Sequence, residues 1–180
     1  MSALENQPDN LNYLSPLGFR FTMDRIPKCT YFLQGAEIPN ISLGEYDEST
    51  PLAALPYPGD KLRFDPLTIT FRVDEDLQNY LEINNWLQGL GFPESFQQYT
   101  NLINDRTRPT TQGQDANIYS DGGLILYTSS QNPNVLVKFK NLFPIGLSAI
   151  TLASTESDVN YVEATAQFRY YVYNIELINN

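Results

Sequence analysis

Acidic residues cluster at two places in the sequence, and the first is the run Asp-Glu-Asp at positions 74–76, followed by Glu82. A calcium-binding loop needs oxygen ligands at alternating positions, a glycine at the sixth position and a glutamate at the twelfth. Counted from Asp74, those two positions hold Asn79 and Asn85, so the calcium pattern is absent. The run instead predicts a helix start, with Asp74 as the N-cap and two more acids at the positive end of the helix dipole.

The second cluster consists of Glu37, Glu45, Asp47, Glu48 and Asp60. A pair of carboxylates at a fixed separation is the machinery of glycoside hydrolysis. Spacing singles out no pair here, so a solvated acidic hairpin is the favoured interpretation. Hydrolysis by carboxylates is the weakest of the functional hypotheses.

Other residue types that do chemistry are scarce. The sequence has no histidine, which removes imidazole acid–base catalysis, the common catalytic triads and the usual nitrogen ligand of metals. Cys29 is the only cysteine and stands beside Tyr31 and Phe32, so we expect a small core residue and no disulfide or cysteine zinc site. No glycine-rich phosphate-binding motif is present. We therefore predict that the chain is not an enzyme and needs no cofactor or metal.

Composition limits the partners. The 180 residues fit a single domain, and twelve Tyr, ten Phe and one Trp favour β-structure. A net charge of −10 weakens binding to nucleic acid and to anionic membranes, although DNA can still pass without sticking. No run of eighteen apolar residues occurs, so we expect no membrane insertion by this chain. The polar start is unlike a secretory signal, which predicts the cytosol of the producing cell.

The elements that must position any site are mostly strands. Apolar residues alternate with polar ones, as in Phe19, Phe21 and Met23, and this period of two indicates half-buried strands. Prolines and glycines set the expected ends. We predict strands over residues 17–26, 29–38, 67–73, 124–129, 135–143, 147–153 and 162–177. Because the connections are short, the sheet should be largely antiparallel.

One helix is well marked, over residues 74–90. Its apolar residues recur at three-four spacing, and glycine at positions 89 and 91 ends it. The predicted buried stripe is Leu77, Tyr80, Ile83, Leu87 and Leu90. Residues 94–103 form a candidate second short helix, and residues 104–121 are expected to be a long surface loop.

The segment 41–63 carries acids first and then several prolines and a glycine, which predicts a long, irregular hairpin that projects from the core. Residues 1–15 are polar and read as a flexible or partner-docked arm. The fold class predicted is mainly β with one helix (α+β), with one domain over residues 16–180.

Two further groups could contact other subunits. Arg106 and Arg108 lie in the long loop, where docking on an acidic neighbouring subunit is preferred to a nucleic-acid contact. Tyr170, Tyr171 and Tyr173 place hydroxylated rings on both faces of the last strand. Such rings suit a subunit interface, and ordinary tyrosines of a sheet face remain the alternative.

Read in order, the sequence resembles the tail tube proteins of contractile-tailed phages. Residues 66–94 (PLTITFRVDEDLQNYLEINNWLQGLGFPE) resemble the family's strand–helix unit, with Trp86 as the aromatic residue near the helix end. Residues 29–67 resemble its strand, "x-IP" bend and long hairpin. Residues 137–173 resemble its closing "K-x-L-(W/F)-P" hairpin end, acidic turn and alternating last strand. The likeness covers residues 17 to about 175.

The resemblance implies an antiparallel β-barrel or sandwich with a flanking helix, six copies of which form a ring. Stacked rings would form the inner tail tube through which DNA passes, inside a virion tail assembled in the host cytoplasm. Tail sheath, baseplate hub and tail terminator proteins would be the partners. The hairpin would reach an adjacent ring or neighbour through Gly44, Glu45, Tyr46, Asp47, Glu48, Leu55, Tyr57 and Asp60.

The same fold also serves tube initiators, baseplate hubs, tail terminators and the tubes of secretion systems and bacteriocins. A baseplate hub, tube-initiator or tail-end ring role therefore stays open beside the tube role. A carbohydrate-binding β-domain, favoured by the many aromatics and the acidic loops, is a more distant alternative.

Overall fold

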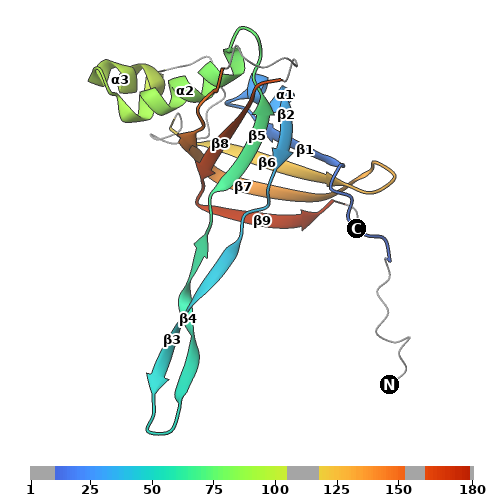
Figure 1. Cartoon of the computed structure of the whole chain (residues 1–180), viewed down its shortest axis with the longest axis vertical. Helices are drawn as coiled ribbons and strands as arrows, with labels where there is room; N and C mark the ends of the chain where they lie inside the picture. The colour runs from blue at the N-terminus through green and yellow to red at the C-terminus, as the bar shows by residue number, and fades with distance from the viewer. Residues whose placement is uncertain (1–10, 105–117, 153–160, 179–180) are drawn as a thin grey trace.

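A computed structural model describes residues 11–104, 118–152 and 161–178 (Figure 1). Seven strands form one antiparallel sheet in the order β1-β6-β7-β8-β5-β2, with β9 also paired to β7. They are β1 (Phe19–Met23), β2 (Leu33–Ala36), β5 (Leu67–Arg72), β6 (Ser120–Tyr127), β7 (Pro133–Leu147), β8 (Glu163–Arg169) and β9 (Val172–Leu177). The predicted mainly-β, antiparallel α+β fold is confirmed.

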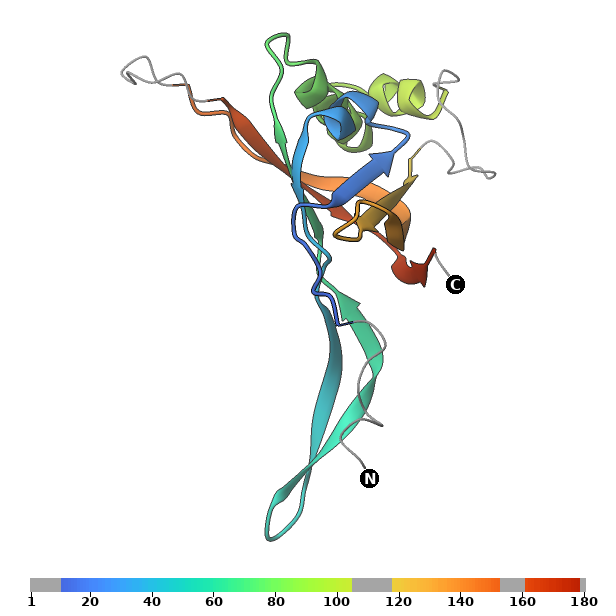
Figure 2. The ribbon, with the colours of Figure 1, turned by 90° about the vertical axis from the view of Figure 1, so that its right-hand side faces the viewer.

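Two further strands, β3 (Ile41–Ser49) and β4 (Ala54–Phe64), form a separate two-stranded sheet. They make the long hairpin that projects from the rest of the fold (Figures 1 and 2). The part of the chain that the structure describes contains three helices, α1 (Pro27–Tyr31), α2 (Gln78–Gly91) and α3 (Phe96–Asn104), where one well-marked helix was predicted.

The helix α1 corrects the predicted strand over residues 29–38. Pro27 ends the alternating strand as expected, but it also stands in the first turn of a helix, where its missing N–H and fixed φ cost nothing. The Glu82 carboxylate of α2 accepts the N–H groups of Lys28 (3.1 Å) and Cys29 (3.3 Å) at this helix start. The first part of the predicted strand is therefore helical, and only its second part, β2, is a strand.

The helix α2 begins later than predicted, because Leu77 takes a left-handed conformation with φ 55° immediately before it. The N-cap is Leu77 and not Asp74 as predicted, and the first turn of α2 contains no acidic residue. Asp74 still contacts the helix start, where its Oδ1 accepts the N–H of Gln78 at 2.6 Å. The fully buried residues are Asn79, Ile83, Trp86 and Gly89. Leu77, which was expected in the buried stripe, is 42% exposed.

β7 corrects the predicted break at Pro144 and Gly146. The strand runs through both residues, and its pairing with β8 shifts register between them. Its earlier part pairs with β6 and β9, and its last part pairs with β8. A proline has no N–H for the ladder, so it is tolerated where the ladder is irregular. Residues 148–152 form no strand, contrary to the prediction over 147–153.

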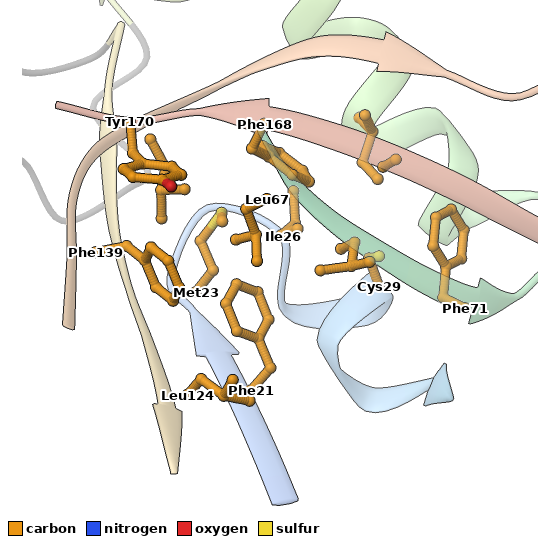
Figure 3. Packing of buried hydrophobic residues seen from close by; sticks show 14 of the residues in the cluster. Phe21, Met23, Ile26, Cys29, Leu67, Phe71, Leu124, Phe139, Phe168 and Tyr170 are labelled. Carbon is orange, nitrogen blue, oxygen red and sulfur yellow. The ribbon is translucent and has the colours of Figure 1, made fainter. Parts of the chain in front are cut away.

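The predicted last strand is divided into β8 and β9 at Tyr170 and Tyr171. Before this corner, β8 pairs with β5 and with the last part of β7. After it, β9 pairs with the earlier part of β7. The hydrophobic core contains Phe21, Leu67, Phe139 and Phe168 (Figure 3). Burial of each such side chain stabilises the fold by about 1.5–3 kcal/mol.

Candidate assembly surfaces

The β3–β4 hairpin is the most exposed element of regular structure. Almost every residue in both strands is exposed, although the strands pair over their whole length. A two-stranded hairpin alone is marginally stable in water. Its role therefore depends on the side chains that its two faces expose and on the contacts that fix its orientation relative to the main sheet.

One face of the hairpin tip is aromatic and apolar. Tyr46 pairs with Tyr57 and Glu48 pairs with Leu55, so these four side chains share a face. The rings of Tyr46 and Tyr57 stack with centroids 5.4 Å apart and an interplanar angle of 16°. Both tyrosines and Leu55 are exposed. We call Tyr46, Glu48, Leu55 and Tyr57 the tip face.

The opposite face of the tip is acidic and proline-containing. Glu45 pairs with Pro58 and Asp47 pairs with Pro56, which places all four on the side away from the tip face. Proline lacks the N–H that a further strand would need, so this part of β4 is a poor edge for continued pairing. The hairpin thus has one face suited to apolar contact and one suited to solvent.

The hairpin bends at an irregularity between its tip and its base. The β3–β4 register shifts between Leu43 and Glu45, where Gly44 faces the segment around Gly59 and Asp60. A Cβ added to Gly59 would lie 2.5 Å from the main-chain oxygen of Gly44. Only glycine allows that approach.

The base of the hairpin is held by four aromatic rings, from Phe64, Phe139, Tyr170 and Tyr173, which we call the aromatic clamp. The centroid of Phe64 lies 5.9 Å from that of Tyr170 and 5.8 Å from that of Tyr173. Phe139 lies 5.3 and 5.6 Å from the same two tyrosines. Three of these pairs are edge-to-face and the Phe139–Tyr173 pair is tilted. Edge-to-face pairs at these separations add to the stability that burial alone gives.

Hydrogen bonds tie both ends of the hairpin to the clamp. Tyr170 donates its hydroxyl hydrogen to the main-chain oxygen of Asp65 (2.8 Å), just after β4. Tyr173 donates to the main-chain oxygen of Pro39 (3.0 Å), just before β3. The N–H of Asp65 also donates to the main-chain oxygen of Asn40 (3.1 Å), which closes the base.

Burial raises the pKa of Tyr170 to about 12, and the neighbouring Tyr173 and Asp65 act in the same direction while Arg169 opposes them. Tyr170 therefore stays neutral and keeps its donor at ordinary pH. Burial also raises the pKa of the Cys29 thiol, as does the nearby Glu82 carboxylate. A protonated, buried thiol is a packing residue and not a nucleophile.

The structure places the predicted interface residues in different environments. Tyr171 is 78% exposed and can reach a partner, whereas Tyr173 is buried in the clamp. Arg106 and Arg108 lie outside the described residues. The sequence reading missed the roles of Phe64 and Tyr170. Burial follows every second residue up to Tyr170 and then resumes at Tyr173, but tyrosines stand at positions 170, 171 and 173, so the alternation of residue types does not show this shift.

A groove of about 1100 Å³ forms a second candidate surface. Its apolar lining includes Tyr31, Phe32, Leu77, Leu152 and Tyr161, which come from α1, the start of α2 and the segments before and after residues 153–160. We call it the end groove.

Arg72, at the C-terminal end of β5, also lines the end groove. Its guanidinium carbon lies 4.8 Å from the ring centroid of Tyr161. Asp74 and Glu75 contribute carboxylates to the same groove.

Among residues 11–104, 118–152 and 161–178, no group of three Asp, Glu, Cys or His side chains is placed to hold a metal ion. No helix in the same part of the chain is both long and apolar enough to cross a membrane.

No protein-family model and no curated protein matches this sequence. Solved structures do match. A chain of the tube-terminating cap of the anti-feeding prophage aligns with a TM-score of 0.57 at 13% identity, over 98% of this chain and 99% of that chain. A chain of the sheath–tube complex of an extracellular contractile injection system, PVC, in the extended state gives 0.53 at 12% identity, over 99% of both chains. A chain of the anti-feeding prophage baseplate gives 0.53 at 12%, over 90% and 93%.

The chain therefore has the contractile-tail tube fold, as the order of its strands and helix predicted. The alignments span nearly the full length of the cap and sheath–tube chains, so the likeness concerns the whole chain and not one motif. At 12–13% identity it extends to the fold alone.

Proposed function

We propose that the chain is a structural subunit of a contractile phage-type tail, which assembles as rings of six copies that stack into the inner tail tube. The observation that carries this proposal is the projecting hairpin on a tail-tube fold. Its tip face exposes two stacked tyrosines and a leucine, whose exposed fractions lie between 39% and 59%. The aromatic clamp holds the hairpin in one direction, so less conformational entropy is lost when it binds a neighbour.

The proposed partners are other copies of this chain, the tail sheath, and baseplate hub or tail terminator proteins. The matched baseplate is described as six-fold symmetrised, which supports a six-membered ring. The net charge of −10 suits a conduit through which DNA passes without specific binding, because an acidic wall repels phosphates. The tail of the virion is the proposed location, after assembly in the host cytoplasm, and no enzymatic role is proposed.

An end-ring or tube-initiator role is the second candidate. The likeness to a tube-terminating cap, over 98% of this chain, favours it. The two roles differ in one respect: a tube subunit must contact copies of itself on both sides of the ring, whereas an end ring needs such a contact on one side only.

Electron microscopy of the purified chain at high concentration, together with a mass measurement, separates the candidates. Six-fold rings that stack into hollow tubes support the tube role. Isolated closed rings support the end-ring or initiator role. A chain that stays monomeric at every concentration and joins no tail partner would overturn both, and a glycan array would then test the carbohydrate-binding alternative.

A further inference from the structure

We infer that the docking of β9 controls how firmly the hairpin is held: a neighbouring subunit that pairs with the open edge of β9 also tightens the hairpin base. Closure of a ring would thus prepare each subunit for stacking. This inference rests on the proposed ring, and the occupant of the edge is a second copy of this chain.

β9 has one open edge. Within the part of the chain that the structure describes, its only strand partner is β7. Figure 1 shows β9 at the margin of the sheet, where the hairpin leaves it. β1, paired there with β6 alone, is the open edge at the other end of the stretch β1-β6-β7-β9. Two different open edges on one sheet allow a contact between identical copies that repeats around a ring.

Side-chain packing holds only a small part of β9. Tyr173 is buried, whereas Ile175 and Leu177, on the same face, are 58% and 62% exposed. Besides the backbone ladder, the ion pair of Lys138 with Glu176 ties the strand to β7 across 2.6 Å, and both side chains are about half exposed. Exposed ion pairs contribute little stability. The strand therefore gains order when a neighbour pairs with its open edge.

The hairpin is held by β9 and by the corner just before it. Tyr173 is the second residue of β9, and its hydroxyl bond to the oxygen of Pro39 holds the chain just before β3. Tyr170 stands at the corner, and its bond to the oxygen of Asp65 holds the junction where β4 leads through Asp65 and Pro66 directly into β5. Both donors therefore move with the start of β9.

Aromatic contacts couple the same parts. Phe64, the last residue of β4, contacts both clamp tyrosines. Phe139 is paired with Tyr173 across the β7–β9 ladder, so the position of Tyr173 depends on that ladder. Displacement of Tyr173 from β7 thus removes a hydrogen bond and an aromatic contact from the hairpin base together.

The coupling works in both directions, because linkage between two sites is reciprocal. A contact that stabilises β9 raises the fraction of subunits whose hairpin is held, and a held hairpin strengthens the contact at β9 by the same factor. We expect a factor of about five or more. A subunit within a ring then stacks more readily than a free subunit, so rings form before stacks.

The first part of the test uses the free subunit. Ile175→Gly/Leu177→Gly loosens β9 without loss of a buried side chain. Hydrogen exchange of amides in residues 41–49 and 54–64 should become about five-fold faster or more. Thr22→Gly, at an exposed position of β1, is the matched control and should leave hairpin exchange unchanged.

Asn174→Thr tests the opposite change, at an exposed position of β9 where threonine favours the strand. Exchange should become slower both in β9 and in the hairpin. Circular dichroism checks that each variant folds. If exchange in residues 172–177 changes in either variant while hairpin exchange stays as in wild type, the coupling is overturned.

The second part compares free subunits with closed, unstacked rings separated by sedimentation. In wild type, ring closure should slow hairpin exchange about five-fold or more. Tyr170→Phe/Tyr173→Phe keeps the aromatic clamp and removes both donated bonds, so it should form rings with little change in hairpin exchange. Equal slowing in both proteins would show that the neighbour shields the hairpin directly, which overturns the coupling while the ring role stands. If wild type forms no ring with itself or with tail partners, the proposed function fails, and the first part still decides whether β9 holds the hairpin.

Discussion

The hydroxyl of Tyr173 donates a hydrogen bond to the main-chain oxygen of Pro39 across 3.0 Å, although 134 residues separate the two in the sequence. Tyr173 belongs to β9 of the main sheet, and Pro39 stands just before the hairpin begins. The bond therefore joins the projecting hairpin to the most C-terminal strand. With the Tyr170–Asp65 bond it fixes both strands of the hairpin at their base.

Tyr173→Phe should keep the ring packing and lose only this hydrogen bond. The buried carbonyl of Pro39 then loses its donor, at a cost of about 1 kcal/mol, which corresponds to a drop in Tm of about 2–4 °C for a chain of this size. Thermal unfolding measures the change. Tyr171→Phe, at the exposed neighbouring tyrosine, is the matched control and should leave Tm unchanged; equal effects at both positions would contradict the role given to Tyr173.

Phe64→Ala should release the hairpin while the main sheet stays folded. The substitution removes the ring that contacts both Tyr170 and Tyr173, and because Phe64 is only partly buried we expect a cost of about 2 kcal/mol, below the range for fully buried phenylalanines. Hydrogen exchange should become faster for amides of residues 41–64 and stay unchanged in β6 and β7. Uniformly faster exchange would show that Phe64 supports the whole fold instead.

Gly59→Ala should distort the hairpin, because its new Cβ would meet the main-chain oxygen of Gly44 at 2.5 Å. The contacted atoms of Gly44 all belong to the main chain, so the backbone must move, at a cost of about 1–3 kcal/mol. Gly44→Ala is the control on the opposite strand, since nothing lies within 4 Å of its added Cβ. Ring stacking should fall for Gly59→Ala and persist for Gly44→Ala, and the reverse order would refute this account of the irregularity.

Stability should fall at high pH through Tyr170. Its pKa is about 12 in the folded protein and 10 as the ordinary value, so the folded state binds the proton more tightly than the unfolded state. The stabilisation is complete below pH 10 and is lost as the pH rises toward 12. Tm measured from pH 8 to 12 should show a decline that is smaller in Tyr170→Phe. An identical decline in both proteins would assign it to other tyrosines.

Period-two alternation predicted much of the sheet correctly. Phe21 and Met23 in β1, and Leu67, Ile69 and Phe71 in β5, are buried as their spacing indicated. Alternation failed where the chain turns a corner within a strand, because a shift in register does not interrupt the apolar pattern. Pro144 was therefore predicted to end a strand that continues.

The candidate surfaces were predictable to different degrees. The hairpin could be inferred locally, from β-favouring residues bounded by Pro39 and Pro66. The clamp could not, because it depends on contacts such as Phe64 with Tyr173 that only the folded sheet brings together. The end groove likewise combines Tyr31, Leu77 and Tyr161 from distant segments.

The continuity of β4 with β5 has a mechanical consequence. A pull applied at the hairpin turn travels along one backbone into β5, which is paired with β8 from Leu67↔Phe168 to Arg72↔Glu163 and with β2 on its other side. Because the force acts parallel to the strand, it shears the backbone hydrogen bonds of both strand pairs. These bonds share the force and must break together instead of one after another. Tension between subunits is thereby carried into the buried strand and not into a loop.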